Sequence, residues 1–227
     1  MADAGVYRRA TAGALVAAPV LFLVDNLIHP KEVARGNEAE QLREIADNYT
    51  RWQLAHAIGF VSIVLFAAAV LGLAYLVRRR QPRLGLLAGA ASVAGLIGLG
   101  AAMAIDGFTW GILGESSVKP EVGTRAAAAI LKDVQNSEWS LVYYGGTVGF
   151  VAGLAALAIG AIRQGAVPLW AGGLLALATL MVGTEPALIS NAWFIAGAAV
   201  LVLGGAAVAL ALARMSDEEF AAGGPAP

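Results

Sequence analysis

Cysteine is absent from this chain of 227 residues, histidine occurs only twice, and charged residues are scarce. Without cysteine, the chain can form no disulfide, no thiolate metal site and no cysteine nucleophile. Only 14% of the residues are charged, whereas a typical soluble domain has roughly a quarter. The formal net charge is −1, and no basic patch suggests a nucleic-acid partner. The composition therefore excludes an ordinary soluble domain.

Long apolar runs take the place of the missing charge. Apolar residues make up 59% of the chain, and six runs approach or exceed the roughly 20 residues that cross a bilayer. The predicted spans are residues 10–28, 52–77, 84–105, 139–162, 167–184 and 191–213. We therefore predict an all-α membrane protein with a six-helix bundle over residues 1–213, followed by a disordered cytoplasmic tail over 214–227. The first run lacks a persuasive cleavage site and is expected to be a retained span.

Two of the predicted connections carry helical patterns of their own. Residues 37–47 mix Leu42 and Ile45 with acidic and basic residues, a spacing typical of a short amphipathic helix on a surface. Residues 124–135 contain a run of alanines and also favour a short helix. Within the fourth span, Gly145, Gly149 and Gly153 repeat every four residues, which predicts close helix packing or, alternatively, contact with another subunit.

Basic residues predict the orientation of the bundle. Arg8, Arg9, Arg163, Arg214 and the cluster over residues 78–83 all fall on one side when six spans alternate. Because basic residues in short loops mark the cytoplasmic side, both termini are expected in the cytoplasm. The expected location is the inner (plasma) membrane of a bacterium, with several passes.

This orientation places polar and aromatic residues together at the outer end of the bundle. The ionisable candidates for catalysis are Asp25, His29, His56, Asp106 and Glu185, with Glu138 nearby. The candidates for lining a substrate site are Phe22, Trp52, Phe60, Phe108, Trp110, Trp139, Tyr143, Tyr144, Trp193 and Phe194. The inner half is almost entirely aliphatic, which predicts a tightly packed plug there.

Most of these residues have an ordinary explanation. Aromatic side chains gather at membrane interfaces, and acids near helix ends cap backbone groups, so Asp106, Glu138 and Glu185 are expected mainly in such roles. Asp25 differs because it lies about one turn inside the predicted end of its span, where an ionisable group must face the bundle. His56 fits a structural hydrogen bond as well as a ligand or proton-transfer role.

Three classes of function fit this pattern. The first is a membrane-embedded enzyme in which Asp25 protonates an alkene or epoxide, aromatic rings stabilise the carbocation, and His29 or His56 orients the acid or takes the final proton. The second is a metal or haem site built on His29 and His56, although neither belongs to a spaced metal motif. The third is a non-catalytic membrane partner or a small transporter, although no internal repeat of the kind that carriers show is evident.

The overall plan resembles small bacterial integral-membrane terpene cyclases, which cyclise prenyl chains on indole or diketopiperazine acceptors. The shared features are a short all-helical membrane chain, isolated acids near span ends and aromatic residues near those acids. The resemblance implies protonation-initiated cyclisation of a lipid-like prenyl substrate, with no metal and no cofactor.

The likeness has two limits. The residues Leu27-Ile28-His29-Pro30, followed by Trp52 and Leu54-Ala55-His56, also look like a wider group of small bacterial membrane proteins without an assigned function. The Asp-x-Asp-Asp signature of soluble cyclases is absent, which leaves the general acid open among Asp25, Asp106 and Glu185.

Overall fold

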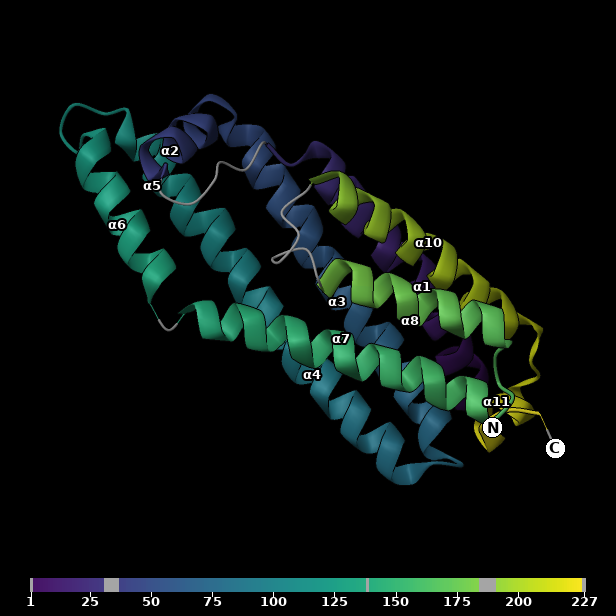
Figure 1. The fold of residues 1–227 in the computed structure, drawn as a ribbon. Helices are drawn as coiled ribbons and strands as arrows, with labels where there is room; N and C mark the ends of the chain where they lie inside the picture. The colour runs from purple at the N-terminus through teal and green to yellow at the C-terminus, as the bar shows by residue number, and fades with distance from the viewer. Residues whose placement is uncertain (1, 31–36, 138, 184–190, 226–227) are drawn as a thin grey trace.

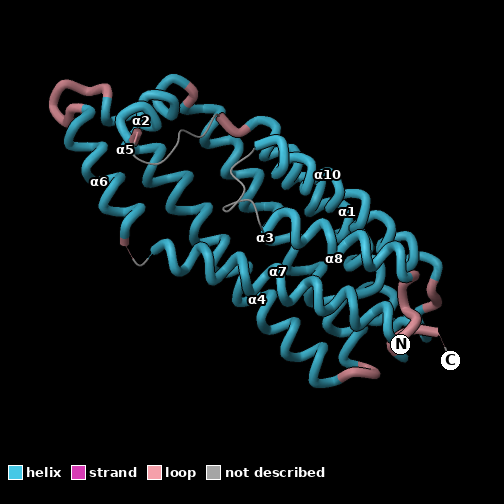
Figure 2. Tube along the Cα trace, viewed as in Figure 1, coloured by secondary structure: helices cyan, strands magenta, loops and turns pink. Residues whose placement is uncertain are grey.

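The structure is a computed structural model, and it describes residues 2–30, 37–137, 139–183 and 191–225. All regular elements in these ranges are helical (Figure 2). In chain order they are α1 (Ala2–Ile28), α2 (Glu38–Asp47), α3 (Tyr49–Arg78), α4 (Pro82–Ala104), the π-helix η1 (Ile105–Trp110), α5 (Gly111–Ser117), α6 (Thr124–Asn136), α7 (Trp139–Arg163), α8 (Leu169–Gly183), α10 (Asn191–Arg214) and α11 (Asp217–Ala222). The all-helical fold class is confirmed for this part of the chain.

The six longest apolar helices form a closed ring. Around the ring α1 contacts α3, α3 contacts α4, α4 contacts α7, α7 contacts α8, α8 contacts α10, and α10 returns to α1. The α4–α7 contact is the most extensive, and α3 also reaches α7 across the ring. Neighbours in the chain are therefore mostly neighbours in space, as short connections between antiparallel helices require.

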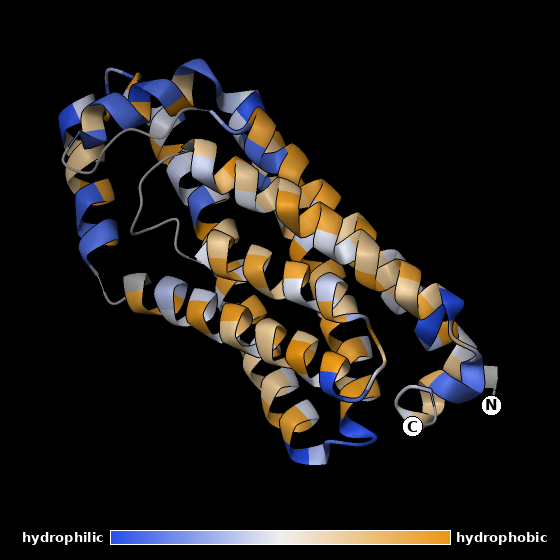
Figure 3. Cartoon of the chain, turned by 45° about the vertical axis from the view of Figure 1, so that its right-hand side comes forward, coloured by the Kyte–Doolittle hydropathy of each residue, from blue (hydrophilic) through white to orange (hydrophobic). Residues whose placement is uncertain are grey.

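Helix length and surface composition identify the chain as a multi-pass membrane protein. Among the described residues, five apolar stretches are long enough to cross a bilayer: Ala4–Ile28, Tyr49–Arg78, Pro82–Ser117, Leu141–Arg163 and Ala192–Arg214. Large apolar side chains such as Leu86, Ile97 and Leu203 are 61–69% exposed on their outer faces, as lipid contact demands. Polar residues gather at the two ends of the bundle (Figure 3).

The predicted fifth span is shorter than expected within the described residues. Leu169–Gly183 has 15 residues, about 22 Å of helix, which falls short of a hydrocarbon core of roughly 30 Å. The rest of the predicted span, at residue 184, lies outside the described residues. The span over residues 10–28 is instead longer than predicted, because α1 already begins at Ala2.

Glycines set the close α4–α7 contact, but in a different register from the predicted one. Gly149 lies against Ala91 and Gly95 of α4, and a Cβ at Gly153 would stand 2.5 Å from the Ala88 carbonyl oxygen. Gly146 joins this face, whereas Gly145 has open space around its Cα. The repeat therefore packs against a helix of its own chain through Gly146, Gly149 and Gly153, and the inclusion of Gly145 was wrong.

A small second core closes one end of the bundle. Leu42 of α2 packs with Ala127 and Leu131 of α6, and α5 contacts both of these helices at the same end (Figure 1). The two short helices expected over residues 37–47 and 124–135 are both present. The sequence missed that α4 continues through η1 into α5, so that residues 111–117 are helical and not part of a loop.

The opposite end, which we call the basic end, holds both chain termini (Figure 1). Arg8 forms an ion pair with Asp217 at 2.9 Å, and Arg80 donates to the carbonyl oxygens of Gly224 and Pro225. Arg78 and Arg79 stack on Tyr75. Three of the basic residues expected on one side of the membrane, Arg8, Arg79 and Arg80, thus lie against the C-terminal segment.

This C-terminal segment corrects the expectation of a disordered tail. Asp217–Ala222 forms α11, which begins with a complete capping box between Ser216 and Glu219. Phe220 is fully buried and stacks on Tyr75, with 5.8 Å between ring centroids. Composition suggested disorder because the tail is acidic and contains Gly and Pro, but one aromatic anchor and one ion pair dock it onto α3 and α1.

The glycine contact predicts an asymmetric response to added bulk. We expect Gly153→Leu to lower the unfolding free energy by about 1–3 kcal/mol or more, because the Ala88 carbonyl cannot move aside without bending α4. Gly145→Leu is the matched control and should leave stability nearly unchanged. Thermal unfolding in detergent measures both, and equal melting temperatures for the two variants would contradict the packing register.

Removal of the aromatic anchor should release α11 alone. Phe220→Ala is expected to weaken docking of this helix by about 3–5 kcal/mol, because the ring is fully buried. Limited trypsin digestion should then cleave faster after Arg214, while the exposed substitution Glu218→Ala should leave the digestion rate unchanged. A Phe220→Ala protein as resistant as the original would show that α11 is held by other contacts.

Candidate functional site

The candidate site begins where α1 and α3 approach closely around Asp25. The Asp25 side chain is 3% exposed. A Cβ at Gly59 of α3 would stand 2.8 Å from the Asp25 carboxyl oxygen Oδ2 and 3.0 Å from Cε of Met103. The missing side chain at Gly59 therefore makes the space that the carboxyl group occupies. One turn further along α3, Ser62 donates to the Ala18 carbonyl oxygen at 2.8 Å and ties the two helices together.

Two imidazole rings face each other one turn away. The backbone N–H of His29 donates to the Asp25 carbonyl oxygen, so the helical hydrogen-bond pattern of α1 continues to His29. The ring centroids of His29 and His56 are 5.1 Å apart, and His56 is buried. His56 lies three residues before Gly59, so both stand on the face of α3 that meets Asp25.

Backbone carbonyls fix the same tautomer in both rings. His29 Nδ1 lies 2.8 Å from the Pro30 carbonyl oxygen, and His56 Nδ1 lies 2.9 Å from the Trp52 carbonyl oxygen. A carbonyl oxygen only accepts hydrogen bonds, so each neutral ring carries its proton on Nδ1 and presents a lone pair on Nε2. Both rings are thereby arranged as proton acceptors or metal ligands.

The π-helix η1 closes the site from the side of α4. Trp52 Nε1 donates to the Asp106 carbonyl at 3.1 Å, and Gln53 Nε2 donates to the Gly107 carbonyl at 2.8 Å. A Cβ at Gly107 would stand 2.8 Å from Cβ of His56. A π-turn widens the helix and turns carbonyls outward, and here Trp52 and Gln53 use those carbonyls to hold α3 against η1.

Arg51 secures the end of α1 from the same turn of α3. Its Nε donates to the Ile28 carbonyl, and Nη2 reaches the His29 carbonyl at 3.5 Å. These are the last carbonyls of α1, which lack a partner within the helix. A cation at this position also opposes the negative end of the helix dipole. Arg51 thus fixes the place of His29.

Aromatic rings form two clusters, one helical turn before and one turn after Asp25 on α1, and we call the two clusters together the aromatic column. On one side His29, His56 and Trp52 touch one another, and Trp52 stacks on Trp110 at 6.3 Å. On the other side Phe22, one turn before Asp25 on α1, contacts Phe66 and Phe194, and Phe66 contacts Phe150. The column therefore spans α1, α3, α7, α10 and η1.

The predicted site residues fall into three groups. Asp25, His29, His56, Phe22, Trp52, Trp110 and Phe194 come together with the backbone of Asp106. Phe60, Phe108, Tyr144 and Trp193 are 38–65% exposed. Tyr143 pairs with Tyr144, with 5.4 Å between the ring centroids. Glu138, Glu185 and the side chain of Trp139 lie outside the described residues.

Sequence reasoning missed the residues that make room for the site or hold it. Gly59, Gly107, Gln53, Arg51 and Met103 carry no catalytic signature. The usable signal was spacing: Gly59 lies three residues after His56 and therefore on the same helix face. Gly107 follows Asp106 directly, but nothing in the sequence indicates a π-turn there.

The histidine pair does not fit a haem. Two imidazoles on opposite sides of an iron, with each nitrogen about 2.0–2.1 Å from the metal, have ring centres separated by roughly 6 Å. The observed separation is 5.1 Å, and Trp52 contacts both rings. Both histidines show the outer hydrogen bond that metal ligands use, but no group of three or more His, Asp or Glu side chains is placed to hold a metal within the described residues.

Comparison of the chain with protein-family models, curated proteins and solved structures finds no match.

The Trp52 hydrogen bond gives a test of the site's architecture. Trp52→Phe keeps an aromatic ring but removes the donor to the Asp106 carbonyl, so we expect a loss of about 1–3 kcal/mol of stability. Trp170→Phe, at a position 63% exposed, is the matched control and should change stability little. Thermal unfolding in detergent measures both. Identical melting temperatures for the two variants would mean that the Trp52 indole does not anchor η1.

Proposed function

We propose that this protein is a membrane-embedded enzyme that cyclises a prenyl chain by protonating it, with Asp25 as the general acid. The observation that carries the proposal is the position of Asp25: an ionisable group 3% exposed, inside an apolar span and within a column of aromatic rings. Such a residue is costly to keep in a bilayer and is by default a functional candidate.

The surroundings of Asp25 suit a general acid. Its carboxyl group lies against Gly59 and beside Met103, between α1, α3 and α4. As the general acid, Asp25 would enter the reaction in its protonated form and give up that proton in the first step.

The proposed reaction is an isomerisation: one proton is added and one is lost, so the cyclic product has the same formula as the substrate. The Asp25 hydroxyl gives its proton to a terminal alkene and leaves a tertiary carbocation on the substrate. The π electrons of an internal alkene attack that cation and close a ring. A neighbouring carbon then loses a proton to the Nε2 lone pair of His56 or His29, and transfer of this proton restores the Asp25 acid. With a terminal epoxide, protonation opens the oxirane to an alcohol and the same sequence follows.

The aromatic column supplies what the cation needs. Ring faces attract a cation within about 6 Å by about 0.5–2 kcal/mol, and more strongly where water is excluded. Phe22 and Phe66 lie on the apolar side of Asp25, where a prenyl tail entering from the bilayer would pass. Trp52, His56 and His29 lie on the polar side, where the fixed tautomers present proton acceptors.

The orientation forms part of the proposal. Both termini lie at the basic end with Arg8 and Arg80, and basic residues favour the cytoplasmic side (Figure 1). Six passes would bring the two termini to the same side. Asp25 and the histidines would then act in the outer leaflet.

The test is turnover of a defined probe by the protein in liposomes. A prenylated indole and its terminal epoxide should be converted to cyclic isomers, and product formed in D2O should carry one deuterium from the proton donor. Asp25→Asn should lower the rate roughly 100- to 10,000-fold, as loss of a general acid does, while the melting temperature stays close to that of the original protein.

Asp133→Asn, an exposed position on α6, is the matched control and should retain full activity. Asp25→Asn protein that cyclises either probe at the original rate would remove Asp25 from the mechanism. Original protein that converts neither probe would overturn the proposal.

A further inference from the structure

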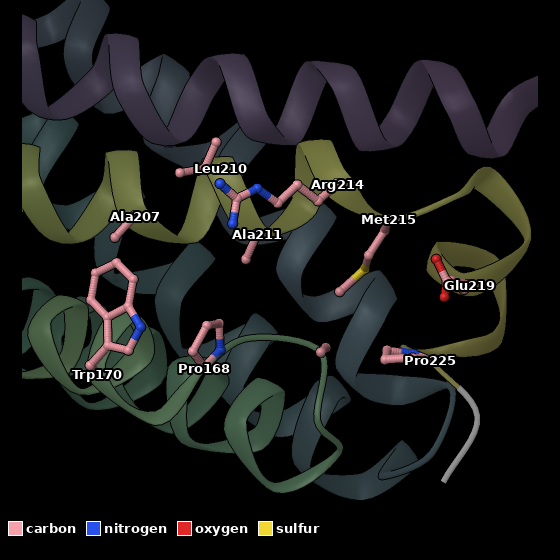
Figure 4. A pocket seen from close by; sticks show the side chains of 10 residues that line it. Pro168, Trp170, Ala207, Leu210, Ala211, Arg214, Met215, Glu219 and Pro225 are labelled. Carbon is pink, nitrogen blue, oxygen red and sulfur yellow. The ribbon is translucent and has the colours of Figure 1, made fainter.

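A second feature of the molecule lies at the basic end, far along the bundle from Asp25. A cavity of about 270 Å³ opens between α8 and α10. Apolar side chains make up most of its wall, among them Trp170, Ala207, Leu210, Ala211 and Met215. One cation, Arg214, stands in this wall at the last turn of α10 (Figure 4). We call this feature the α8–α10 groove.

Arg214 is not needed to cap its own helix. The last carbonyls of α10, those of Leu212 and Ala213, accept hydrogen bonds from Arg8 Nη1, both at 3.2 Å. Arg8 is in turn neutralised by Asp217 at 2.9 Å. Arg8 therefore caps the end of α10 and is itself paired with Asp217, which leaves Arg214 without a role in either interaction.

No acid within the described residues neutralises Arg214. Glu219 lines the same cavity and keeps its negative charge, but it forms no ion pair with Arg214, and Figure 4 shows the Arg214 side chain extending away from it. The nearby arginines have other partners: Arg80 binds backbone carbonyls and Arg79 stacks on Tyr75. Figure 4 shows the Arg214 side chain extending back along α10 towards Leu210, with Trp170 and Pro168 across the groove.

The groove lies where a lipid headgroup meets its acyl chains. Trp170 is 63% exposed at the start of α8, and tryptophan and arginine at a span end mark the level of the membrane interface. A volume of about 270 Å³ is below the roughly 300–1,000 Å³ of pockets that enclose a whole small ligand. The space suits the upper part of one acyl chain, with the charged group just above it.

From this arrangement we propose that the α8–α10 groove is a binding site for an anionic phospholipid. Arg214 pairs with the lipid phosphate through its fork of N–H donors, and the apolar wall between Trp170 and Ala211 receives the adjoining acyl chain. Charge complementarity selects the occupant, because Arg214 forms no ion pair within the described residues and extends away from Glu219, so that the phosphate of an anionic lipid can serve as its counter-ion. This site is independent of the cyclisation chemistry at Asp25.

Native mass spectrometry of the full chain in mild detergent tests the site, with phosphatidylglycerol and phosphatidylcholine as probes. The original protein should bind phosphatidylglycerol more tightly. Arg214→Gln should weaken that binding about fivefold, the effect of one basic residue at a lipid surface, and Arg214→Lys should restore most of it. Arg83→Gln, an exposed arginine at the same end, is the matched control and should keep the original preference.

Filling the groove gives a second measurement that does not depend on charge. Ala211→Phe should reduce binding of phosphatidylglycerol while Arg214 stays in place. Equal affinity of the original protein for both lipids, or an undiminished preference in Arg214→Gln, would overturn the proposal. Displacement of the lipid by millimolar inorganic phosphate would also overturn it, because the site would then recognise free phosphate and not a lipid.

Discussion

The burial of one carboxyl group between α1 and α3 constrains the half of the bundle that lies opposite the basic end. Asp25 can lie inside an apolar span only if the facing helix comes close without a side chain of its own at that point, and Gly59 meets this condition. The close approach then brings His56 beside His29 and places Trp52 against η1. The protein around the carboxyl group thus meets the cost of placing it inside a span.

The sequence was sufficient for the parts of the fold that follow from hydrophobicity and periodicity. Apolar runs of sufficient length predicted the membrane helices, and the alternation of Leu42 and Ile45 with charged residues predicted α2. Helix spacing placed Asp25 and His29 on one face, because residues four apart share a face, and the alternation of spans placed His56 at the same end. These signals are local, so they can be read without knowing which helices are neighbours.

Features that depend on a neighbouring helix could not be predicted in the same way. A repeat of glycines every four residues does not say which of two adjacent glycines faces the partner, and α4 selects Gly146 over Gly145. The order of α11 depends on Tyr75 and Arg8, which lie far away in sequence. The exposed positions of Phe60 and Phe108 follow from helix rotation, which near-uniform hydrophobicity leaves undetermined.

The π-turn of η1 also sets the rotation, about the helix axis, of the cap built from α2, α5 and α6 relative to the membrane helices. Gly114 of α5 lies against Ile45 of α2, so the cap docks on one particular face of the continuous stretch Pro82–Ser117. Loss of one residue between Ile105 and Trp110 would convert the turn to an ordinary α-helix and rotate everything after it by about 100°. Insertions and deletions should therefore be rare in these six residues of related chains, even where the flanking side chains vary freely.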